Sequence, residues 1–231
     1  MSHEPVLQAE RLVKIYRTDS VETPALRGVD LVIQKGEFTA VAGPSGSGKS
    51  TLLHLLGGLD KPTSGEVFLE GKPLSKLHPE ALARLRLKKI GFVFQAYNLI
   101  PVLTVLENTA FVLELQGVPY RERIKRARAI LAELGIEKYA DQYPHRLSGG
   151  EQQRVAVARA VVGEPAVVLA DEPTANLDGE NSRALIDLMR RLNETRGTTF
   201  LFATHDMRLL DRVNRLLTLE DGRITSDRRQ A

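Results

Sequence analysis

The sequence contains no cysteine, so disulfide bonds and metal sites built on thiolates are excluded. It also contains no uninterrupted apolar run of the ~18 residues that a membrane-spanning helix requires. Residues 1–17 mix charged and apolar side chains and lack the continuous apolar segment of a signal peptide. We therefore expect a protein that acts in the cytosol, either free or bound peripherally to another component.

The sequence also has little excess of charge of one sign. It has 32 basic and 29 acidic residues, a net charge of +3, and the two signs are interspersed along the chain. Nucleic-acid binders usually concentrate basic residues on one face, so we expect no nucleic-acid partner. Two basic runs, within 84–89 and 121–128, lie on stretches with helical periodicity. A solvated helix face is the favoured interpretation, and docking at an anionic membrane surface is the alternative.

Apolar patterning predicts an α/β fold. The chain is 42 % apolar, which is enough for a sizeable core. Runs typical of strands alternate with helical patterns, and the signal from about 104 to 160 is helical, like an insertion into the sheet. The expected strands are 12–16, 29–33, 66–69, 90–94, 167–170 and 199–203, and the expected helices are 106–115, 121–134 and 181–191.

The most informative segment is a glycine-rich stretch between an apolar strand, 38–42, and a helical leucine pattern. Its glycine spacing, followed by Lys49 and Ser50, is that of a phosphate-binding P-loop. Glycines let backbone amides converge on a phosphate, and the helix start adds positive potential. We expect Lys49 to lie between phosphates and the Ser50 hydroxyl to ligate Mg²⁺. A glycine-rich turn that matches by chance is the alternative. The candidate nucleotide-binding residues are Gly43, Pro44, Ser45, Gly46, Ser47, Gly48, Lys49, Ser50 and Thr51.

A second nucleotide element is an apolar run, 166–170, that ends in Asp171 and Glu172. A strand buried on both faces needs such a run, and its carboxylates then emerge at the edge of the sheet beside the P-loop. Asp171 is suited to hold Mg²⁺, directly or through water. Glu172 is suited to polarise the attacking water as a general base. The alternative is that both carboxylates only solvate the end of the strand.

Two further polar residues, Gln95 and His205, follow the expected strands 90–94 and 199–203. A histidine at a strand end is usually structural, but this edge of the sheet makes a contact with the γ-phosphate or with water plausible. The Gln95 amide could touch both Mg²⁺ and the attacking water, and could report the nucleotide state to the helices that follow. The candidate catalytic residues are Lys49, Gln95, Glu172 and His205, and the candidate metal ligands are Ser50, Gln95 and Asp171.

Residues 147–154 are expected to start a helix, and the N-terminus of this helix is a second candidate anion-binding site. Ser148 can cap this helix, while Gly149 and Gly150 leave backbone amides uncovered. One nucleotide needs only one P-loop, so the simplest use of this element is in trans, over a nucleotide held by another subunit. An ordinary capping turn is the alternative.

Together these motifs resemble the nucleotide-binding subunit of ABC transporters, from about residue 7 to residue 224. The set occurs in the order and spacing of that family, and Ser-Gly-Gly-Glu-Gln within a P-loop protein is highly specific. The motifs that carry the resemblance are Gly43 to Thr51, Gln95, Leu147 to Gln152, Asp171-Glu172, Asn176-Leu177-Asp178 and His205.

The resemblance implies a P-loop nucleoside-triphosphatase core with an N-terminal antiparallel β subdomain and an inserted α-helical subdomain. Residues 1–231 would form a single domain, with the core in 1–95 and 161–231 and the helical subdomain in 96–160. It also implies ATP and Mg²⁺ as cofactors and a head-to-tail homodimer in the ATP-bound state.

By the same resemblance, further residues gain roles at the dimer interface and beside the nucleotide. Ser148, Gly149 and Gly150 would contact the γ-phosphate held by the partner's P-loop. Tyr16 would stack on adenine, and Asp178 would lie in the loop that links the two sites. The family further implies an integral-membrane permease as partner, and a peripheral location on the cytoplasmic face of the inner membrane.

Finer features resemble one branch of the family, the lipoprotein-releasing and macrolide exporters LolD and MacB. They are Gly57 to Asp60, Pro62 to Glu66 and Asn98 to Pro101. This branch implies ATP-driven export or extraction of a lipoprotein, peptide or drug-like substrate. The near relative FtsE leaves an alternative, an ATPase that signals to cell-wall remodelling without transport. One departure is Ala175, where the branch usually has glycine, and it puts only the detail of dimer coupling in doubt.

Overall fold

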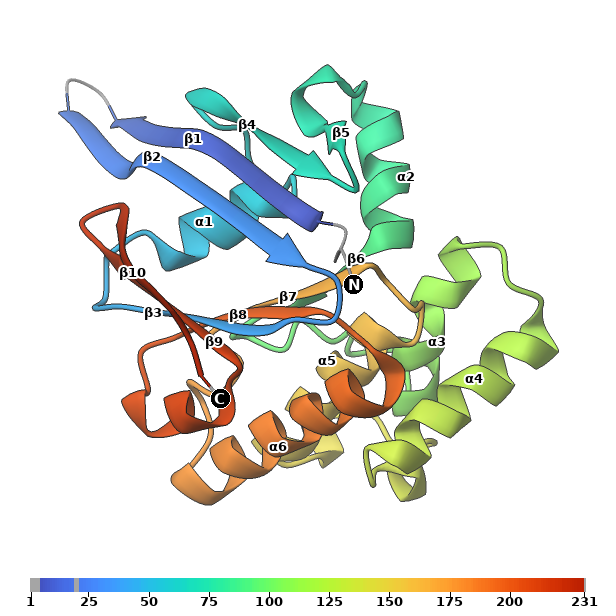
Figure 1. The fold of residues 1–231 in the computed structure, drawn as a ribbon. Coiled ribbons are helices and arrows are strands. Elements are labelled where there is room, and N and C mark those ends of the chain that lie inside the picture. The colour runs from blue at the N-terminus through green and yellow to red at the C-terminus, as the bar shows by residue number, and fades with distance from the viewer. Residues whose placement is uncertain (1–4, 19–20, 231) are drawn as a thin grey trace.

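The strands of this protein form two sheets, one antiparallel and one mostly parallel (Figure 1). The computed structural model describes residues 5–18 and 21–230. In these residues, the strand order is β2-β1-β4-β5 in one sheet and β10-β9-β3-β8-β7-β6 in the other. The strands are β1 (Pro5–Thr18), β2 (Val21–Gln34), β3 (Phe38–Ala42), β4 (Ser64–Leu69), β5 (Lys72–Pro73), β6 (Ile90–Val93), β7 (Val167–Asp171), β8 (Phe200–Thr204), β9 (Arg215–Glu220) and β10 (Arg223–Arg229).

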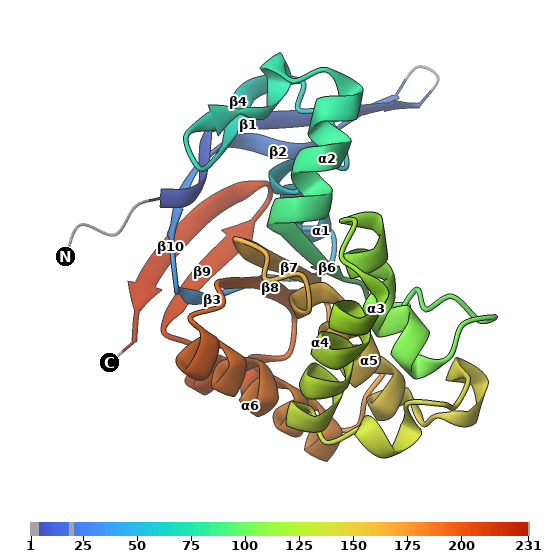
Figure 2. The same ribbon diagram turned by 90° about the vertical axis from the view of Figure 1, so that its right-hand side faces the viewer.

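Helices pack between and beneath the sheets. Figure 1 shows α1 between the two sheets and α6 on the opposite face of the larger one, while Figure 2 shows α3, α4 and α5 grouped at one side. The α-helices are α1 (Lys49–Leu56), α2 (Pro79–Lys89), α3 (Val105–Leu115), α4 (Tyr120–Glu133), α5 (Gly149–Val161) and α6 (Gly179–Arg196). Short 3-10 helices are η1 (Leu74–Lys76), η2 (Glu137–Tyr139), η3 (Pro144–Arg146) and η4 (Met207–Arg212).

The larger sheet is parallel from β9 through β3, β8 and β7 to β6, and only β10 at its edge is antiparallel. Its central strands are buried on both faces because their side chains alternate between two apolar cores. Val168 and Ala170 of β7 belong to the core shared with α3 to α6. Val167 and Leu169 belong to the core shared with α1 and the antiparallel sheet. The parallel direction brings the carboxyl ends of these strands to one edge.

The expected elements are present, with different bounds. Helices expected at 106–115, 121–134 and 181–191 correspond to α3, α4 and α6, and α6 is longer at both ends. The short strands expected near the N-terminus are parts of β1 and β2, which pair along most of their length. The strand expected at 90–94 ends one residue earlier, at Val93. The subdomain limits at 96 and 160 stay a prediction.

The hairpin of β9 and β10 was not anticipated from the sequence. It extends the larger sheet at the β3 edge, and its anchor is Arg215, which is 8 % exposed. The Arg215 guanidinium donates to Asp227 at 2.7 and 2.8 Å and to Glu37 at 2.9 Å. A buried cation is tolerated because these carboxylates surround it. This network fixes the hairpin beside the strand that leads to the P-loop.

No helix in the described part of the chain is long and apolar enough to cross a membrane.

Candidate functional site

The loop between β3 and α1 has a backbone that only glycine can follow at two positions. Gly48 has φ 104°, and a Cβ there would lie 2.5 Å from the Ala25 carbonyl oxygen. A Cβ on Gly43 would lie 2.1 Å from the Leu219 carbonyl oxygen. The loop is thus pressed against β2 and β9, with no room for side chains beneath it. Gly48 also caps α1 without any side-chain hydrogen bond, so the amides of the first turn are open to an anion.

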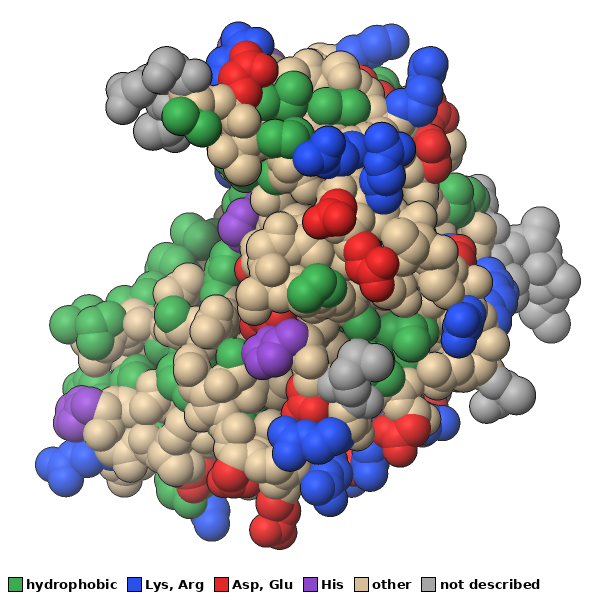
Figure 3. All heavy atoms as spheres, turned by 90° about the vertical axis from the view of Figure 1, so that its left-hand side faces the viewer, with side chains coloured by type: hydrophobic (Ala, Val, Ile, Leu, Met, Phe, Trp, Pro, Cys, Tyr) green, Lys and Arg blue, Asp and Glu red, His purple; other side chains and the backbone are tan. Residues whose placement is uncertain are grey.

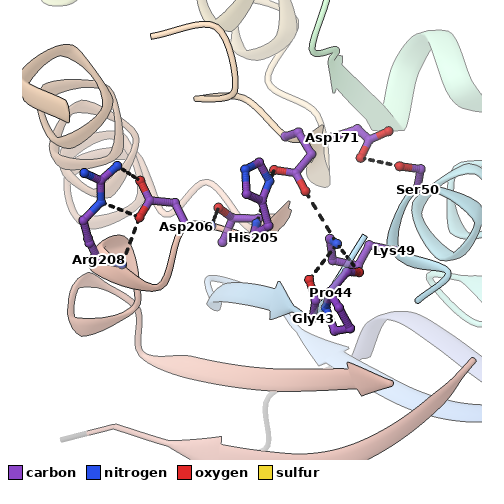
Figure 4. A network of polar contacts seen from close by, with 10 residues as sticks. Gly43, Pro44, Lys49, Ser50, Asp171, His205, Asp206 and Arg208 are labelled. Carbon is purple, nitrogen blue, oxygen red and sulfur yellow. Dashed lines mark hydrogen bonds and ion pairs between the residues drawn. The ribbon is translucent and has the colours of Figure 1, made fainter. Parts of the chain in front are cut away.

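Lys49 is the first residue of α1, and its side chain is only 6 % exposed. Its ammonium group donates to the carbonyl oxygens of Gly43 at 2.9 Å and Pro44 at 3.0 Å, so it folds back over the loop (Figure 4). The ammonium also lies 3.6 Å from a carboxylate oxygen of Glu172. The structure therefore places a cation between the P-loop and the end of β7, and its predicted position between phosphates stays a prediction.

Ser50 and Asp171 meet across the site, although 121 residues separate them. The Ser50 hydroxyl donates to Asp171 Oδ1 at 2.9 Å, and His54 Nε2 lies 3.9 Å from Asp171 Oδ2. Burial raises the pKa of the Asp171 carboxyl above its ordinary value, and the Ser50 hydrogen bond opposes this rise. A hydroxyl and a carboxylate oxygen, together with phosphate and water oxygens, form the donor set that Mg²⁺ prefers. These residues fit that ion.

Glu172 lies beyond the end of β7 and has a left-handed backbone, with φ 47°. Its Oε2 lies 2.9 Å from His205 Nδ1 and 3.3 Å from the His205 backbone nitrogen. Because a carboxylate only accepts hydrogen bonds, Nδ1 of His205 is the donor in this contact. Glu172 is thus held between Lys49 and His205, the two groups that the sequence places beside it.

A pocket of about 350 Å³ brings most of the predicted site together. Figure 3 shows this face of the molecule, which is indented where the antiparallel sheet projects over the body, with basic and acidic side chains interspersed. The described residues that line the pocket are Ala25, Ser45, Gly46, Gly48, Lys49, Ser50, Thr51, Gln95, Glu172, Ala175 and His205. Gln95, which follows β6 after one intervening residue, is one of these lining residues, and its contacts with Mg²⁺ and water stay a prediction.

Tyr16 belongs to β1 and lies beside α1, the helix that follows the P-loop. Its ring is 40 % exposed, and its hydroxyl lies 3.5 Å from Thr51 Oγ1 and 3.3 Å from Asp60 Oδ2. The Lys14 ammonium sits 4.9 Å from the ring centroid. Stacking on adenine stays a prediction, and this position beside α1 is compatible with it.

The predicted second anion site is at the start of α5 and is not among the described residues that line the P-loop pocket. Ser148 caps the helix as expected and forms a capping box with Glu151. Asp178 caps α6, accepting hydrogen bonds from the amides of Glu180 and Asn181. The Asn181 amide holds the pKa of the Asp178 carboxyl below its ordinary value. Roles of both segments in a dimer interface stay predictions.

Some residues near the site were not found from the sequence. His54 approaches Asp171 from α1. Asn176 was named in the sequence only as part of a family motif, and its hydrogen bond to the Gln95 carbonyl oxygen, at 2.9 Å, was not predicted. Arg159 donates to the carbonyl oxygens of Tyr97 and Asn98, just after Gln95. A histidine one turn after the P-loop lysine could have been noticed. The other contacts depend on tertiary packing that no local motif encodes.

Comparison with known proteins agrees with this geometry. The chain matches a dimeric structure of the cassette MJ0796, bound to ADP and Pi in a post-hydrolysis state, with 40 % identity, a TM-score of 0.89, and coverage of 96 % of this chain and 98 % of that one. A second dimeric MJ0796 structure, of an ABC transporter cassette, matches with the same values. CbiO1 from Clostridium perfringens, part of the ABC transporter complex CbiONQ, matches with 32 % identity, a TM-score of 0.86, and coverage of 97 % and 88 %.

The family model described as ABC transporter covers residues 26–175, more than half of the chain. This span begins in β2 and runs through the P-loop, Gln95, the start of α5 and the Asp171-Glu172 pair. With identity of 40 % across nearly its whole length to a solved cassette, the chain belongs to the ABC transporter family of ATP-binding cassette ATPases.

Proposed function

We propose that this chain is the ATP-hydrolysing subunit of a transporter and drives a separate membrane permease. The observation that carries the proposal is that Lys49, Glu172 and His205 line one pocket at the carboxyl edge of the parallel sheet. Asp171 adjoins this pocket through its hydrogen bond from Ser50. These side chains supply a phosphate-binding cation, a metal-binding carboxylate and a general base beside a bare helix start.

Each residue in and beside the pocket would have its own role in hydrolysis. The P-loop amides and Lys49 would bind the phosphates, and the contacts of Lys49 with Gly43 and Pro44 would give way to phosphate oxygens. Ser50 and Asp171 would hold Mg²⁺, which neutralises developing phosphate charge when bound. Glu172 would accept a proton from water, while His205 orients the carboxylate through the 2.9 Å contact. Gln95, which follows β6, would align the attacking water.

We further propose that two copies close head to tail around two ATP molecules. The start of α5 is the part of this chain suited to complete the site of the other copy, since it does not line its own pocket. The dimeric MJ0796 structures support the pairing of two such cassettes.

The permease would dock near the loop between Gln95 and α3. Val102 in this loop is 76 % exposed, and Tyr143, between η2 and η3, is 44 % exposed. We propose a permease of the lipoprotein-releasing and macrolide-exporter type, on the motifs at 57–60, 62–66 and 98–101, and hence a peripheral location on the cytoplasmic face of the inner membrane. The substrate would be a lipoprotein, peptide or drug-like molecule.

The central test of the ATPase assignment is Glu172→Gln. We expect this variant to bind ATP like the wild type and to lose about 100-fold or more of its hydrolysis rate, because the base is gone while the phosphate cradle remains. Glu220→Gln is the matched control, since Glu220 also ends a strand of the same sheet but is not among the described residues that line the pocket. Near-normal hydrolysis by Glu172→Gln would remove Glu172 from this role.

The test of the permease is capture with the same variant. Tagged Glu172→Gln protein, with ATP and Mg²⁺, is used to pull partners from detergent-solubilised membranes. A permease with few membrane helices and a large extracytoplasmic domain supports the proposal. A partner that controls a cell-wall hydrolase favours the signalling alternative, and ribosomes or DNA-associated proteins without a membrane protein contradict the transporter proposal.

A further inference from the structure

Arg159, in the last turn of α5, is a partly buried cation whose hydrogen-bond partners are backbone carbonyl oxygens. Its Nη1 donates to the Asn98 carbonyl oxygen at 2.6 Å and its Nη2 to the Tyr97 carbonyl oxygen at 3.0 Å. Burial lowers the pKa of the guanidinium, and no acidic neighbour among the described residues offsets this. Removing a charge from water costs free energy when only carbonyl oxygens replace its hydration. The contact of Arg159 with these two oxygens is therefore not explained by stability alone.

The two carbonyl oxygens belong to a strained pair of residues. Tyr97 has φ 55° and Asn98 has φ 49°, both in the left-handed region that side chains other than glycine rarely adopt. This pair follows Gln95 after one intervening residue. Such a conformation persists only where surrounding groups stabilise it. The Arg159 guanidinium fork does so by donating one hydrogen bond to each of the two peptide carbonyl oxygens.

The same segment is tied at two other places. Asn176 donates to the Gln95 carbonyl oxygen at 2.9 Å. The Tyr97 hydroxyl lies against Gly149, where a Cβ would be 2.8 Å from it. Residues 95–98 therefore connect the pocket, through Gln95, with the loop before α6 and with the start of α5.

We propose that Arg159 is a positioning residue for ATP hydrolysis, which holds residues 95–98 in the strained conformation that presents Gln95 to the nucleotide pocket. This inference rests on the proposed role of Gln95 in the pocket. Without the fork, the left-handed pair relaxes and the Gln95 amide leaves the position from which it aligns water. Nucleotide affinity is unaffected, because the hydrogen bonds of Arg159 in the described part of the chain go to residues 97 and 98 and not to the P-loop or α1.

The test compares Arg159→Gln with Arg154→Gln. Arg154 lies on the same helix and also donates to a backbone carbonyl oxygen, that of Leu134 at 3.1 Å, but far along the chain from residues 95–98. For each variant, the urea midpoint, the Kd for ATP and the kcat of hydrolysis are measured. We expect similar losses of stability in both, an unchanged Kd in both, and a kcat lowered tenfold or more in Arg159→Gln alone. Arg159→Lys keeps the charge and should recover part of the kcat.

Each outcome decides the matter. If kcat falls equally in Arg159→Gln and Arg154→Gln, Arg159 is only a structural arginine and the inference is overturned. If Arg159→Gln does not fold, Arg159→Lys carries the test, because it loses the fork geometry but retains a cation; a kcat equal to that of the wild type then overturns the inference. Absence of hydrolysis by the wild type, in contrast, overturns the proposed function itself.

Discussion

Helices α1 and α5 both begin at a glycine-rich turn, yet the two turns are built differently. Gly48 caps α1 without a side-chain hydrogen bond, and the first turn of α1 has no acidic residue. Ser148 caps α5 and forms a complete capping box with Glu151. The Ser148 amide and hydroxyl both donate to the same Glu151 oxygen at 2.8 Å. One helix start is therefore bare and the other is satisfied within its own chain.

The two turns, both of which are predicted to bind anions, therefore differ in how ready they are to do so. The first turn of α1 offers amides that no side chain caps, together with the Lys49 cation, so an incoming phosphate has only to replace the Gly43 and Pro44 oxygens that Lys49 contacts. At α5, the Glu151 carboxylate already faces the positive end of the helix, and an incoming phosphate meets that negative charge. We infer that the P-loop binds nucleotide in a single chain, while the α5 turn engages only when a second chain brings its nucleotide close.

The largest expected effect comes from adding a methyl group to one glycine in each turn. Gly48→Ala forces a left-handed alanine against the Ala25 carbonyl oxygen, so we expect a loss of about 2 kcal/mol or more in the free energy of unfolding and at least tenfold weaker ATP binding. At Gly149, the obstacle is the end of the Tyr97 side chain, which can move. Gly149→Ala should therefore lose less than about 1 kcal/mol and keep its ATP affinity as a single chain.

Urea unfolding and titration with a fluorescent ATP analogue check both variants. The comparison predicts that Gly149→Ala shows its defect only in ATP-driven dimerisation, measured in the Glu172→Gln background by size-exclusion chromatography. Equal losses of monomer affinity in the two alanine variants would contradict the distinction between the turns.

Sequence patterns found the bare helix start because strand, loop and helix follow one another without a break. They also predicted that Asp171 emerges beside the P-loop, where the structure has it in contact with Ser50, since the carboxyl ends of parallel strands meet at one edge. They missed β9 because its first residue, Arg215, has the type of an exposed residue but is buried by Glu37 and Asp227. The left-handed backbone of Glu172 could not be foreseen either, since no local signal marks such strain in a residue other than glycine.

A smaller effect is expected from removing the charge of the α5 cap. Glu151→Gln retains an oxygen that can accept hydrogen bonds from Ser148, but it removes the negative charge that repels the phosphate. We therefore expect this variant to dimerise more strongly with ATP, by about 1 kcal/mol, or roughly fivefold. Glu107→Gln is the matched control, because Thr104 and Glu107 form the same capping box at the start of α3. Analytical ultracentrifugation of both variants with ATP, in the Glu172→Gln background, gives the dimerisation constants. The same change in both variants would show that capping alone matters.

The smallest expected effect concerns the pH dependence of stability at the α5 cap. A hydrogen bond from Tyr139, followed by those from the Ser148 amide and hydroxyl, holds the pKa of Glu151 below its ordinary value of 4.5. A lowered pKa in the folded state means that the ionised cap stabilises the protein fully above that ordinary value, and that this contribution disappears as the pH falls through the folded-state pKa. The difference in unfolding free energy between wild type and Glu151→Gln should thus be a few tenths of a kcal/mol at pH 7 and shrink below about pH 4.5. Urea midpoints of both proteins at pH 7, 5 and 4 measure it. The start of α1 has no acidic cap that could titrate. If the difference in unfolding free energy between wild type and Glu151→Gln stays constant over this pH range, the Glu151 charge does not stabilise the α5 turn. The two helix starts would then differ only in shape.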